Sequence, residues 1–367
     1  MIDLYVFPLT EKNAAAMPFR AADKLTIYGI QNAFTYIAAY NGGIGRSGSI
    51  GRSGGASASE PFTLHLAAGE YREILRYDEP NPLFMNGPNG AQACSAACAV
   101  RAENCEAFRK DTENRALFTV GPKATFVSLK NFTLENTHVK TSPDEALGNQ
   151  AEAFCFHNQN GVLVAENMQF MSRQDTIHVK GFSRFYRCYV TGDIDYVWGY
   201  NNLALFEECT LHTRQDNRGE DLPAYVLQAR TLAGKPGFVF LNCKFSVDPR
   251  PTSPVYIART SGTGSAASAD RWDSVALINC TVDSWYDAAF WTDDGGRAVY
   301  PERGTALSGW REYGTKIAYP DGSVKPADVR FRHKAGYVLS AVEYGLFYRD
   351  CERIVKDTPL ASAVRSE

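Results

Sequence analysis

One pattern of eight residues occurs six times between residues 127 and 282, and it limits the possible fold more than any other feature of the chain. Position 6 of the pattern recurs at intervals of 36, 20, 21, 34 and 37 residues. A short repeat with longer loops inserted in some copies is typical of a solenoid, in which each unit packs only on its neighbours. The copies are VSLKNFTL (127–134), LVAENMQF (163–170), SRFYRCYV (183–190), ALFEECTL (204–211), FVFLNCKF (238–245) and VALINCTV (275–282).

The spacing of apolar residues within each copy indicates a bend. Mainly apolar residues occupy positions 1 and 3, and then positions 6 and 8. Because successive side chains of a strand point to opposite faces, both pairs can face inward only if the chain bends between them. Four copies have Asn at position 5, and Asn accepts the left-handed conformation of such a bend more readily than any residue except Gly. Repeated strand–bend–strand units predict an all-β parallel β-helix. Four cysteines at position 6 are then expected to form one buried interior stack: Cys188, Cys209, Cys243 and Cys280.

Helical patterns flank this repetitive region. Apolar residues from 30 to 38 follow helical spacing and stop near Gly42, which predicts a helix that covers the N-terminal end. Residues 42–60 are rich in Gly and Ser, which predicts a flexible insertion. A capping box formed by Ser340 and Glu343 begins an apolar stripe, which predicts a C-terminal helix over residues 340–357.

The overall composition indicates a folded chain without a bias toward charged partners. The 41 acidic and 38 basic residues give a net charge of −3, which excludes the basic footprint of a nucleic-acid-binding protein. A hydrophobic content of 44% excludes a disordered chain. No apolar run approaches the roughly 20 residues of a membrane helix. We therefore expect one β-helix domain over residues 1–367, monomeric and with no nucleic-acid or membrane partner.

The nine cysteines are odd in number and contain no CxxC pair, so they do not describe a disulfide scaffold. Cys94, Cys98 and Cys105 could form half of a metal site, but no second half or neighbouring histidine accompanies them. We interpret them as thiols of a local insertion. The first residues lack the basic and apolar segments of a secretory signal. These features predict a cytoplasmic protein, and the alternative is a secreted protein whose signal has been removed.

Two aspartates lie at equivalent places in successive repeats. Asp175 is seven residues past Met168, and Asp195 is seven past Cys188. Stacked coils would place them about 5 Å apart at the backbone, the distance between neighbouring strands. Two such carboxylates do not easily both ionise, so one is expected to stay protonated as an acid while the other acts as a nucleophile or base. The alternative is an acidic ladder on an ordinary strand face. Asp216, seven residues past Cys209, is a third candidate in the same series.

The alternation in GDIDYVWG (192–199) gives the expected directions of these side chains. Ile194, Tyr196 and Trp198 share one parity and are expected to face the interior. Asp195 has the opposite parity and is expected to face outward, where a substrate could lie.

Two segments, SRQDTIHV (172–179) and GDIDYVWG, resemble the paired signatures of the pectin methylesterases, or pectinesterases. The stretches AGEYREI (68–74), GNQAEAF (148–154) and VYIARTS (255–261) support the resemblance. It extends from about residue 26 to the last helix. It implies a right-handed parallel β-helix and a carboxylic ester hydrolase that needs no metal and no cofactor.

The resemblance also implies a role for each matching residue. Asp195 matches the family nucleophile and Asp175 the acid/base. Gln150 and Gln174 match the amides that hold the oxyanion, and Arg259 matches the arginine that positions the nucleophile. In this mechanism a carboxylate attacks the ester carbonyl, amide donors stabilise the oxyanion, and a protonated carboxyl donates to the departing alcohol.

Departures from the family pattern affect the expected binding of sugar. His178 stands where the family has an aromatic residue, and Thr260 and Ser261 replace Pro-Trp after the arginine. Substrate contacts are predicted for His178, Tyr196 and Trp198, although the parity of the last two also fits a place in the core.

The predicted function is hydrolysis of methyl esters of galacturonate in pectin or pectic oligosaccharides, with release of methanol. Three alternatives remain: an acetylesterase acting on a related polysaccharide, a non-catalytic carbohydrate-binding β-helix, and a polyuronate lyase. A lyase would require calcium-ligating carboxylates beside a basic residue.

Overall fold

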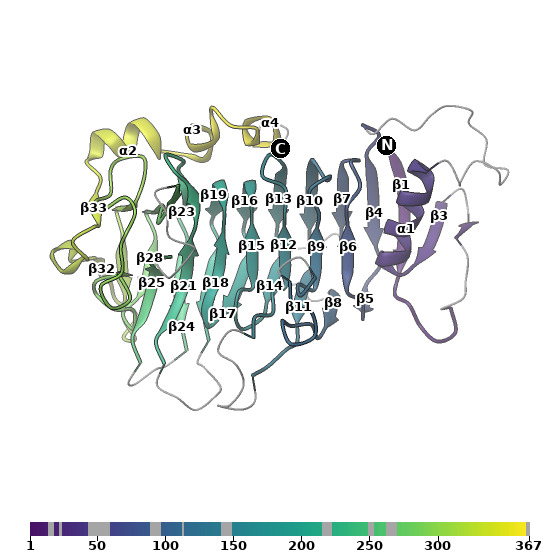
Figure 1. Cartoon of the computed structure of the whole chain (residues 1–367), viewed down its shortest axis with the longest axis horizontal. Coiled ribbons are helices and arrows are strands. Elements are labelled where there is room, and N and C mark those ends of the chain that lie inside the picture. The colour runs from purple at the N-terminus through teal and green to yellow at the C-terminus, as the bar shows by residue number, and fades with distance from the viewer. Residues whose placement is uncertain are drawn as a thin grey trace.

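The chain winds into a stack of coils whose strands line up in long parallel sheets (Figure 1). The computed structural model describes residues 1–13, 18–21, 24–42, 59–88, 97–111, 114–140, 149–214, 222–248, 253–261 and 270–364. Within these ranges each complete coil contributes one strand to each of three sheets, in the order sheet A, sheet B, sheet C. The predicted parallel β-helix is confirmed.

Sheet A is the longest of the three. In spatial order it consists of β2 (Phe19–Ala21), β3 (Lys24–Tyr28), β1 (Ile2–Phe7), β4 (Phe62–Leu66), β7 (Leu83–Asn86), β10 (Phe126–Lys130), β13 (Val162–Glu166), β16 (Gly181–Tyr186), β19 (Asn201–Glu207), β23 (Gly237–Leu241), β27 (Val275–Ile278), β30 (Trp310–Tyr313) and β33 (Tyr337–Val338).

Sheets B and C complete the coils. Sheet B consists of β32 (Val324–Pro326), β31 (Lys316–Ala318), β28 (Thr281–Asp283), β24 (Lys244–Val247), β20 (Thr210–Thr213), β17 (Tyr189–Gly192), β14 (Gln169–Met171), β11 (Thr133–Asn136), β8 (Cys98–Ala102) and β5 (Gly69–Tyr71). Sheet C consists of β29 (Trp291–Thr292), β25 (Val255–Arg259), β21 (Ala224–Ala229), β18 (Ile194–Gly199), β15 (Ile177–Val179), β12 (Phe154–Phe156), β9 (Phe118–Val120) and β6 (Leu75–Tyr77). A separate antiparallel pair joins β22 (Thr231–Leu232) and β26 (Arg271–Trp272).

The bend between sheets A and B has the left-handed backbone that the Asn pattern predicts. Asn131, Asn167, Asn242 and Asn279 have φ angles between 51° and 64°. Arg187 and Glu208 occupy the same position in the other two repeats and adopt the same conformation, with φ of 52° and 53°. The geometry of the coil therefore imposes this conformation even where the residue does not favour it.

The interior is filled by side chains that repeat from coil to coil. Position 3 of the repeat forms an aligned row through Phe185, Phe206 and Phe240, whose rings are in contact. Each fully buried side chain of this size contributes about 2 to 3 kcal/mol. The predicted cysteine stack is also confirmed, because all four position-6 thiols are buried. The thiol of Cys243 donates to the Phe206 carbonyl of the preceding coil, at 3.2 Å.

Helix α1 (Ile30–Asn41) covers the N-terminal end of this interior, as predicted (Figure 1). Its buried face includes Phe34, which contacts the ring of Phe118 in the first coils. The carboxylate of Glu73 accepts hydrogen bonds from the backbone N–H groups of Ile30 and Gln31, each at 2.9 Å. A negative group at this helix terminus satisfies two open donors and interacts favourably with the helix dipole.

The prediction of one continuous C-terminal helix over residues 340–357 is wrong. The structure has α2 (Ala341–Phe347) and α3 (Cys351–Val355), followed by α4 (Leu360–Val364), with the 3₁₀ helix η4 (Val329–Phe331) before them. The Ser340–Glu343 capping box is present. Helix α2 ends at the buried Tyr348, whose hydroxyl accepts from Arg311 and donates to the Ala306 carbonyl, and Asp350 then caps α3.

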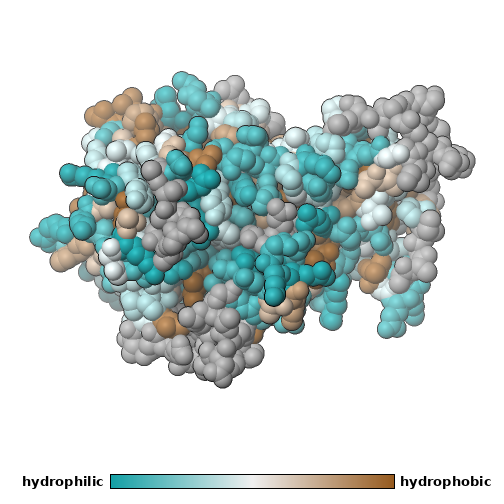
Figure 2. All heavy atoms as spheres, viewed as in Figure 1, coloured by the Kyte–Doolittle hydropathy of each residue, from teal (hydrophilic) through white to brown (hydrophobic). Residues whose placement is uncertain are grey.

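These helices do not cover the C-terminal end of the coils. They run back along the outer face of sheet A (Figure 1), where Leu360 and Val355 join an apolar cluster with strand residues such as Val164 and Leu205. In Figure 2, hydrophobic side chains also gather over α2, where Val342 and Leu346 are exposed.

Three expectations fall wholly or partly outside the described ranges. Most of the Gly/Ser-rich segment 42–60 is not described, nor are Cys94 and Asp216. Cys98 and Cys105 are described and buried. No helix in the described ranges is long and apolar enough to span a membrane.

Candidate active site

The predicted catalytic residues lie where sheet B turns into sheet C, or at the end of a sheet C strand. Their coils are in register: Ala151 N–H donates to the Gln174 carbonyl at 3.4 Å, and Asp175 N–H donates to the Ile194 carbonyl at 3.1 Å. Gln150 precedes β12, Gln174 and Asp175 precede β15, Asp195 is the second residue of β18, and Arg259 ends β25. Residues far apart in sequence therefore meet at one place on the coil stack.

Asp175 and Asp195 occupy neighbouring coils at equivalent positions, as the repeat predicts. Gln174 forms a bridge with Ile194, so the two aspartates that follow are also aligned. Both adopt left-handed backbone conformations, with φ of 61° and 46°. Such conformations cost energy in non-glycine residues and are frequent at functional sites. Both side chains are almost fully buried.

The surroundings of Asp175 favour its protonated form. Burial raises the pKa of this carboxyl well above 3.8, and the Glu152 carboxylate raises the pKa further. Arg115 opposes the rise, since its guanidinium lies 3.4 Å from the Asp175 carboxylate, while Asp195 adds to it. An acid with a raised pKa is suited to donate a proton near neutral pH.

Asp195 is bound by Arg259 through both carboxylate oxygens. The Nε group of Arg259 donates to Oδ1 at 2.9 Å, and a second guanidinium nitrogen donates to Oδ2. This bidentate pairing stabilises the charged carboxylate and fixes its plane. The guanidinium also lies over the ring of Tyr225, 4.5 Å from the centroid, and near Asp294.

Two cations orient the predicted oxyanion amides. The Gln150 Oε1 atom accepts a hydrogen bond from Arg115, and the Gln174 Oε1 atom accepts one from Lys140. With the oxygen of each amide occupied in this way, its NH₂ group is the end left to bind a substrate. Lys140 and Gln174 are both buried, so this orientation is held within the protein.

Arg115, Glu152 and Lys140 were not predicted from the sequence. Glu152 is fully buried and receives hydrogen bonds from two guanidinium nitrogens of Arg115, between 2.7 and 3.0 Å. Burial raises the pKa of Glu152, although Arg115 opposes this. One signal was available: Glu152 is a charged residue within the apolar stretch AEAF. Arg115 and Lys140 have no comparable signal, because their positions depend on how loops of unequal length align.

The inward parity predicted for Trp198 is wrong, and the left-handed Asp195 explains the error. The register of β18 against β21 shifts between Ile194 and Val197, so Tyr196 and Val197 both join the interior cluster. Trp198 is therefore placed on the outer face. There it pairs in register with His178 and Gln228.

The predicted substrate contact of Tyr196 is contradicted by its position. Its ring is fully buried, and its hydroxyl hydrogen-bonds with the hydroxyl of Thr213 at 3.1 Å. Tyr196 is therefore a core residue. His178 and Trp198 lie on the outer face, but both are buried side chains, stacked with ring centroids 3.9 Å apart. Burial and then the nearby Lys180 lower the pKa of His178 well below 6.5, so its imidazole is neutral near pH 7.

A buried carboxylate supports the backbone that follows Arg259. Asp273 accepts hydrogen bonds from the Thr260 hydroxyl at 2.8 Å, the Ser261 N–H at 2.8 Å and the Tyr300 N–H at 3.0 Å. Thr260 and Ser261 stand where the family has Pro-Trp, and hydrogen bonds hold this segment in place here. Burial raises the pKa of Asp273 to about 6, with these hydrogen bonds opposing the rise.

Together these groups can carry out nucleophilic acyl transfer. A fixed carboxylate at Asp195 can attack a carbonyl, amides at Gln150 and Gln174 can donate to the oxygen that becomes negative, and Asp175 can supply a proton. The fold and the paired aspartates thus define a parallel β-helix with an aspartate-based candidate active site. The chain belongs to the pectinesterase family, whose model matches residues 52–263.

Similar proteins agree with this membership. Pectinesterase QRT1 of Arabidopsis thaliana is 23% identical over 240 residues, covering 65% of this chain and 58% of the relative. Probable pectinesterase/pectinesterase inhibitor 64 of the same plant is 25% identical over 194 residues, covering 50% of this chain and 29% of the relative. The chain thus matches between about a third and three fifths of the length of these two relatives.

Solved structures share the fold over nearly the whole chain. Pectin methylesterase PemA from Erwinia chrysanthemi aligns with a TM-score of 0.66 and 16% identity, covering 96% of this chain and 97% of that one. Pectin methylesterase from carrot aligns with a TM-score of 0.64 and 13% identity, covering 98% and 93%. A pectin methylesterase in complex with a hexasaccharide gives a TM-score of 0.64 and 16% identity, covering 96% and 97%.

Proposed function

We propose that this protein hydrolyses methyl esters of galacturonate units in pectin or pectic oligosaccharides and releases methanol. The observation that carries the proposal is the pairing of Asp175 and Asp195 on neighbouring coils, where burial raises the pKa of Asp175 and Arg259 holds the Asp195 carboxylate. Family membership and the names of the relatives supply the substrate class.

Asp195 is the proposed nucleophile. Arg259 fixes its carboxylate on the outer face of the coil stack. Attack on the ester carbonyl would form a tetrahedral intermediate whose oxygen is stabilised by the NH₂ groups of Gln150 and Gln174. Because Arg115 and Lys140 already hold the amide oxygens, these donors need little reorganisation during the reaction.

Asp175 is the proposed acid and base. It donates its proton to the departing methanol when the acyl-enzyme forms, and it then removes a proton from the water that hydrolyses this intermediate. Water thereby restores the carboxylate of Asp195 and the carboxyl of Asp175. The raised pKa of Asp175 supports this role.

Positive charge around the site fits a uronate substrate. Arg230 lies over the rings of Trp198 and Tyr200, 5.1 and 5.5 Å from the centroids, and Arg271 lies over Tyr200 at 5.3 Å. The Arg230 charge also acts on Asp175, and cations so close to the paired aspartates attract the carboxylates of a uronate chain.

The test is the product formed from defined substrates. Methanol is measured from methylated pectin and from methylated oligogalacturonides, acetate is measured from acetylated pectin, and unsaturated ends are followed by absorbance. Asp195→Asn keeps the size of the side chain and removes its nucleophilic charge, and it should lower kcat by about 1000-fold or more, on the order of 4 kcal/mol. Release of acetate alone would indicate an acetylesterase, unsaturated ends a lyase, and binding without any product a carbohydrate-binding protein.

We also propose that the protein acts as a monomer in a reducing compartment. Buried free thiols at Cys155 and in the cysteine stack support this compartment. Light scattering after gel filtration measures the mass against the 40.5 kDa of one chain. Fractionation of the source cells locates the protein.

A further inference from the structure

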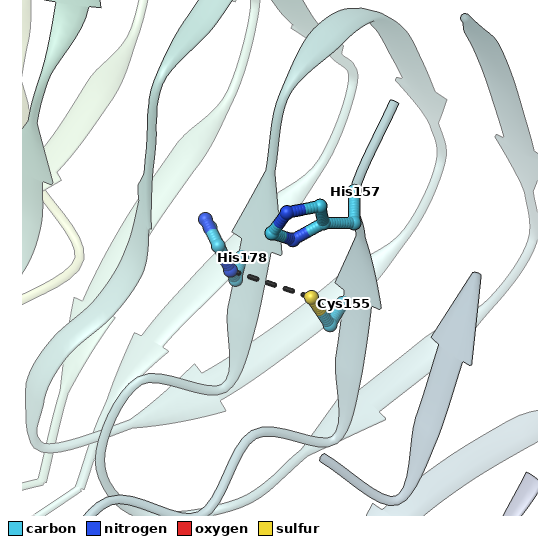
Figure 3. A group of neighbouring side chains, drawn as sticks. All are labelled: Cys155, His157 and His178. Atoms are coloured by element: carbon cyan, nitrogen blue, oxygen red, sulfur yellow. Dashed lines mark hydrogen bonds between the residues drawn. The ribbon is translucent and has the colours of Figure 1, made fainter. Parts of the chain in front are cut away.

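A second group of functional side chains lies beside the candidate active site, on the outer face of sheet C. Cys155 lies in β12, and His157 directly follows this strand. Because the two residues are two positions apart, their side chains point to the same face. His178 on β15 pairs with Cys155 across the ladder. Figure 3 shows the three side chains converging from these two neighbouring segments.

The ligand atoms of this group are close enough to share one ion. The Cys155 Sγ atom and one nitrogen from each of His157 and His178 lie within 4.8 Å of one another. The Sγ atom is 3.3 Å from Nδ1 of His178. A tetrahedral zinc ion with ordinary Zn–S and Zn–N bonds spaces its ligand atoms by roughly 3.3 to 3.6 Å. The Cys155–His178 pair therefore already has the spacing of one edge of the tetrahedron, and the His157 nitrogen lies within 4.8 Å of both ligand atoms.

We propose that Cys155, His157 and His178 form a binding site for a thiophilic transition-metal ion of the Zn²⁺ class. One thiolate and two imidazoles are a donor set that Zn²⁺ favours, and three protein ligands leave a fourth position open. Ligands on paired β-strands are also held more precisely than ligands on loops.

The hydrogen bonding of His178 directs its Nδ1 atom toward the Cys155 thiol. Its Nε2 atom is buried and has no hydrogen-bond partner within the described ranges. The polar contact of the ring is therefore the one between Nδ1 and the Cys155 thiol. With that thiol as donor, the ring proton lies on Nε2 and the Nδ1 lone pair faces the group. Binding of a metal ion replaces the thiol proton, which is released.

The positive charge of Lys180 affects how tightly the site binds a metal ion. The Lys180 ammonium lies 2.7 Å from Nε2 of His157, and its charge opposes a cation in the group. Removing this charge with Lys180→Met is therefore expected to tighten metal binding. A purely structural role for the three residues does not predict such an effect.

Cobalt binding to the reduced full-length chain tests the proposal independently of any hydrolytic activity. A non-thiol reductant is used, and Co²⁺ is titrated while visible d–d bands and near-ultraviolet thiolate charge transfer are recorded. The wild type should bind one Co²⁺ with a charge-transfer band, and Zn²⁺ should displace it. Cys155→Ser should lose that band, and His157→Asn should weaken binding at least about tenfold, as loss of a ligand implies.

Matched variants control for other cysteines and histidines. Cys351→Ser and His65→Asn lie on other elements and should bind as the wild type does. Circular dichroism and thermal melting show whether Cys155→Ser is folded, and His157, which is partly exposed, provides a variant less prone to unfold. The proposal is overturned if the wild type binds no Co²⁺, if folded Cys155→Ser keeps the charge-transfer band, or if Lys180→Met binds more weakly than the wild type.

Discussion

Arg259 binds both carboxylate oxygens of Asp195, although 64 positions separate the two residues in the sequence. Asp195 is the second residue of β18, and Arg259 ends the sheet C strand two coils further along. The orientation of the proposed nucleophile is therefore set by the stacking of three coils. Small changes in that stacking would alter the direction of the carboxylate without removing any residue of the site.

Arg259→Lys tests this relationship. Lysine keeps the positive charge but lacks the planar pair of donors that matches a carboxylate. We expect kcat to fall about 100-fold, or roughly 3 kcal/mol, while KM changes little. Steady-state kinetics with methylated oligogalacturonides measure both constants. An unchanged kcat would show that charge alone suffices and that the bidentate geometry has no part in the reaction.

Asp175→Asn tests the assignment of the acid. The active form needs a protonated Asp175, so activity should decline as pH rises through its raised pKa. The variant should lose about 10² to 10⁴ in kcat, and its residual activity should lack this alkaline decline. His178→Gln is the matched control, since burial keeps His178 neutral near pH 7. If His178→Gln abolished the decline and Asp175→Asn retained it, the imidazole would be the titrating group.

Glu152→Gln should move the alkaline decline to lower pH. The Glu152 carboxylate raises the pKa of Asp175, and it also engages the guanidinium of Arg115. Removing the charge of Glu152 takes away this repulsion and leaves Arg115 freer to stabilise ionised Asp175. Both effects lower the pKa. A complete pH–rate profile of the variant checks the direction, and a decline displaced to higher pH would contradict the pairing described above.

Asp273 predicts a pH dependence of stability. Burial raises its pKa from 3.8 to about 6, so between these values the folded chain binds more protons than the unfolded chain. The free energy of unfolding must then fall as pH rises through this window, by about 3 kcal/mol in all. Urea denaturation at a series of pH values measures the slope. Asp273→Asn should flatten it, and an equal slope in both proteins would contradict the assignment.

The Asn bends predict a backbone effect that can be separated from side-chain contacts. Asn242 is exposed and left-handed, with φ of 55°. Asn242→Ala should destabilise the chain by about 1 kcal/mol, because alanine tolerates this conformation poorly. Asn242→Gly should be close to neutral, since glycine adopts it freely. Denaturant midpoints compare the two variants, and equal losses of stability would point to the lost side chain instead.

The repeat made most of the coil predictable. Positions 3 and 6 both face the interior on either side of the bend, and this pattern defines both the interior rows and the place of Cys243 in its stack. The same spacing aligned Asp175 with Asp195, because each follows an interior residue by seven positions. These predictions rest on local periodicity, which a single sequence contains.

The remaining features depend on relations that periodicity does not encode. Trp198 was placed inside because alternation was extended through Asp195, whose left-handed backbone shifts the register. The Arg115–Glu152 pair joins segments on either side of a long insertion, so its alignment required the fold. The C-terminal segment was predicted as one continuous helix because two features that divide it were not visible in the sequence pattern. These are the N-cap that Asp350 forms for α3 and the hydrogen bond from Arg311 to the Tyr348 hydroxyl.

Helices α2, α3 and α4 run back along sheet A, and this arrangement affects the order in which the coils unfold. In a solenoid, coils contact only their neighbours and can unravel one at a time from either end. Here Leu360 of α4 packs in one cluster with Val162 of β13, about halfway back along the stack, as well as with residues of the later coils. The C-terminal helices therefore hold several coils together, and those coils can separate only after the helices detach from sheet A. Pulling or heating should open the N-terminal coils first and leave the half that carries Asp195 and Arg259 as the last folded unit.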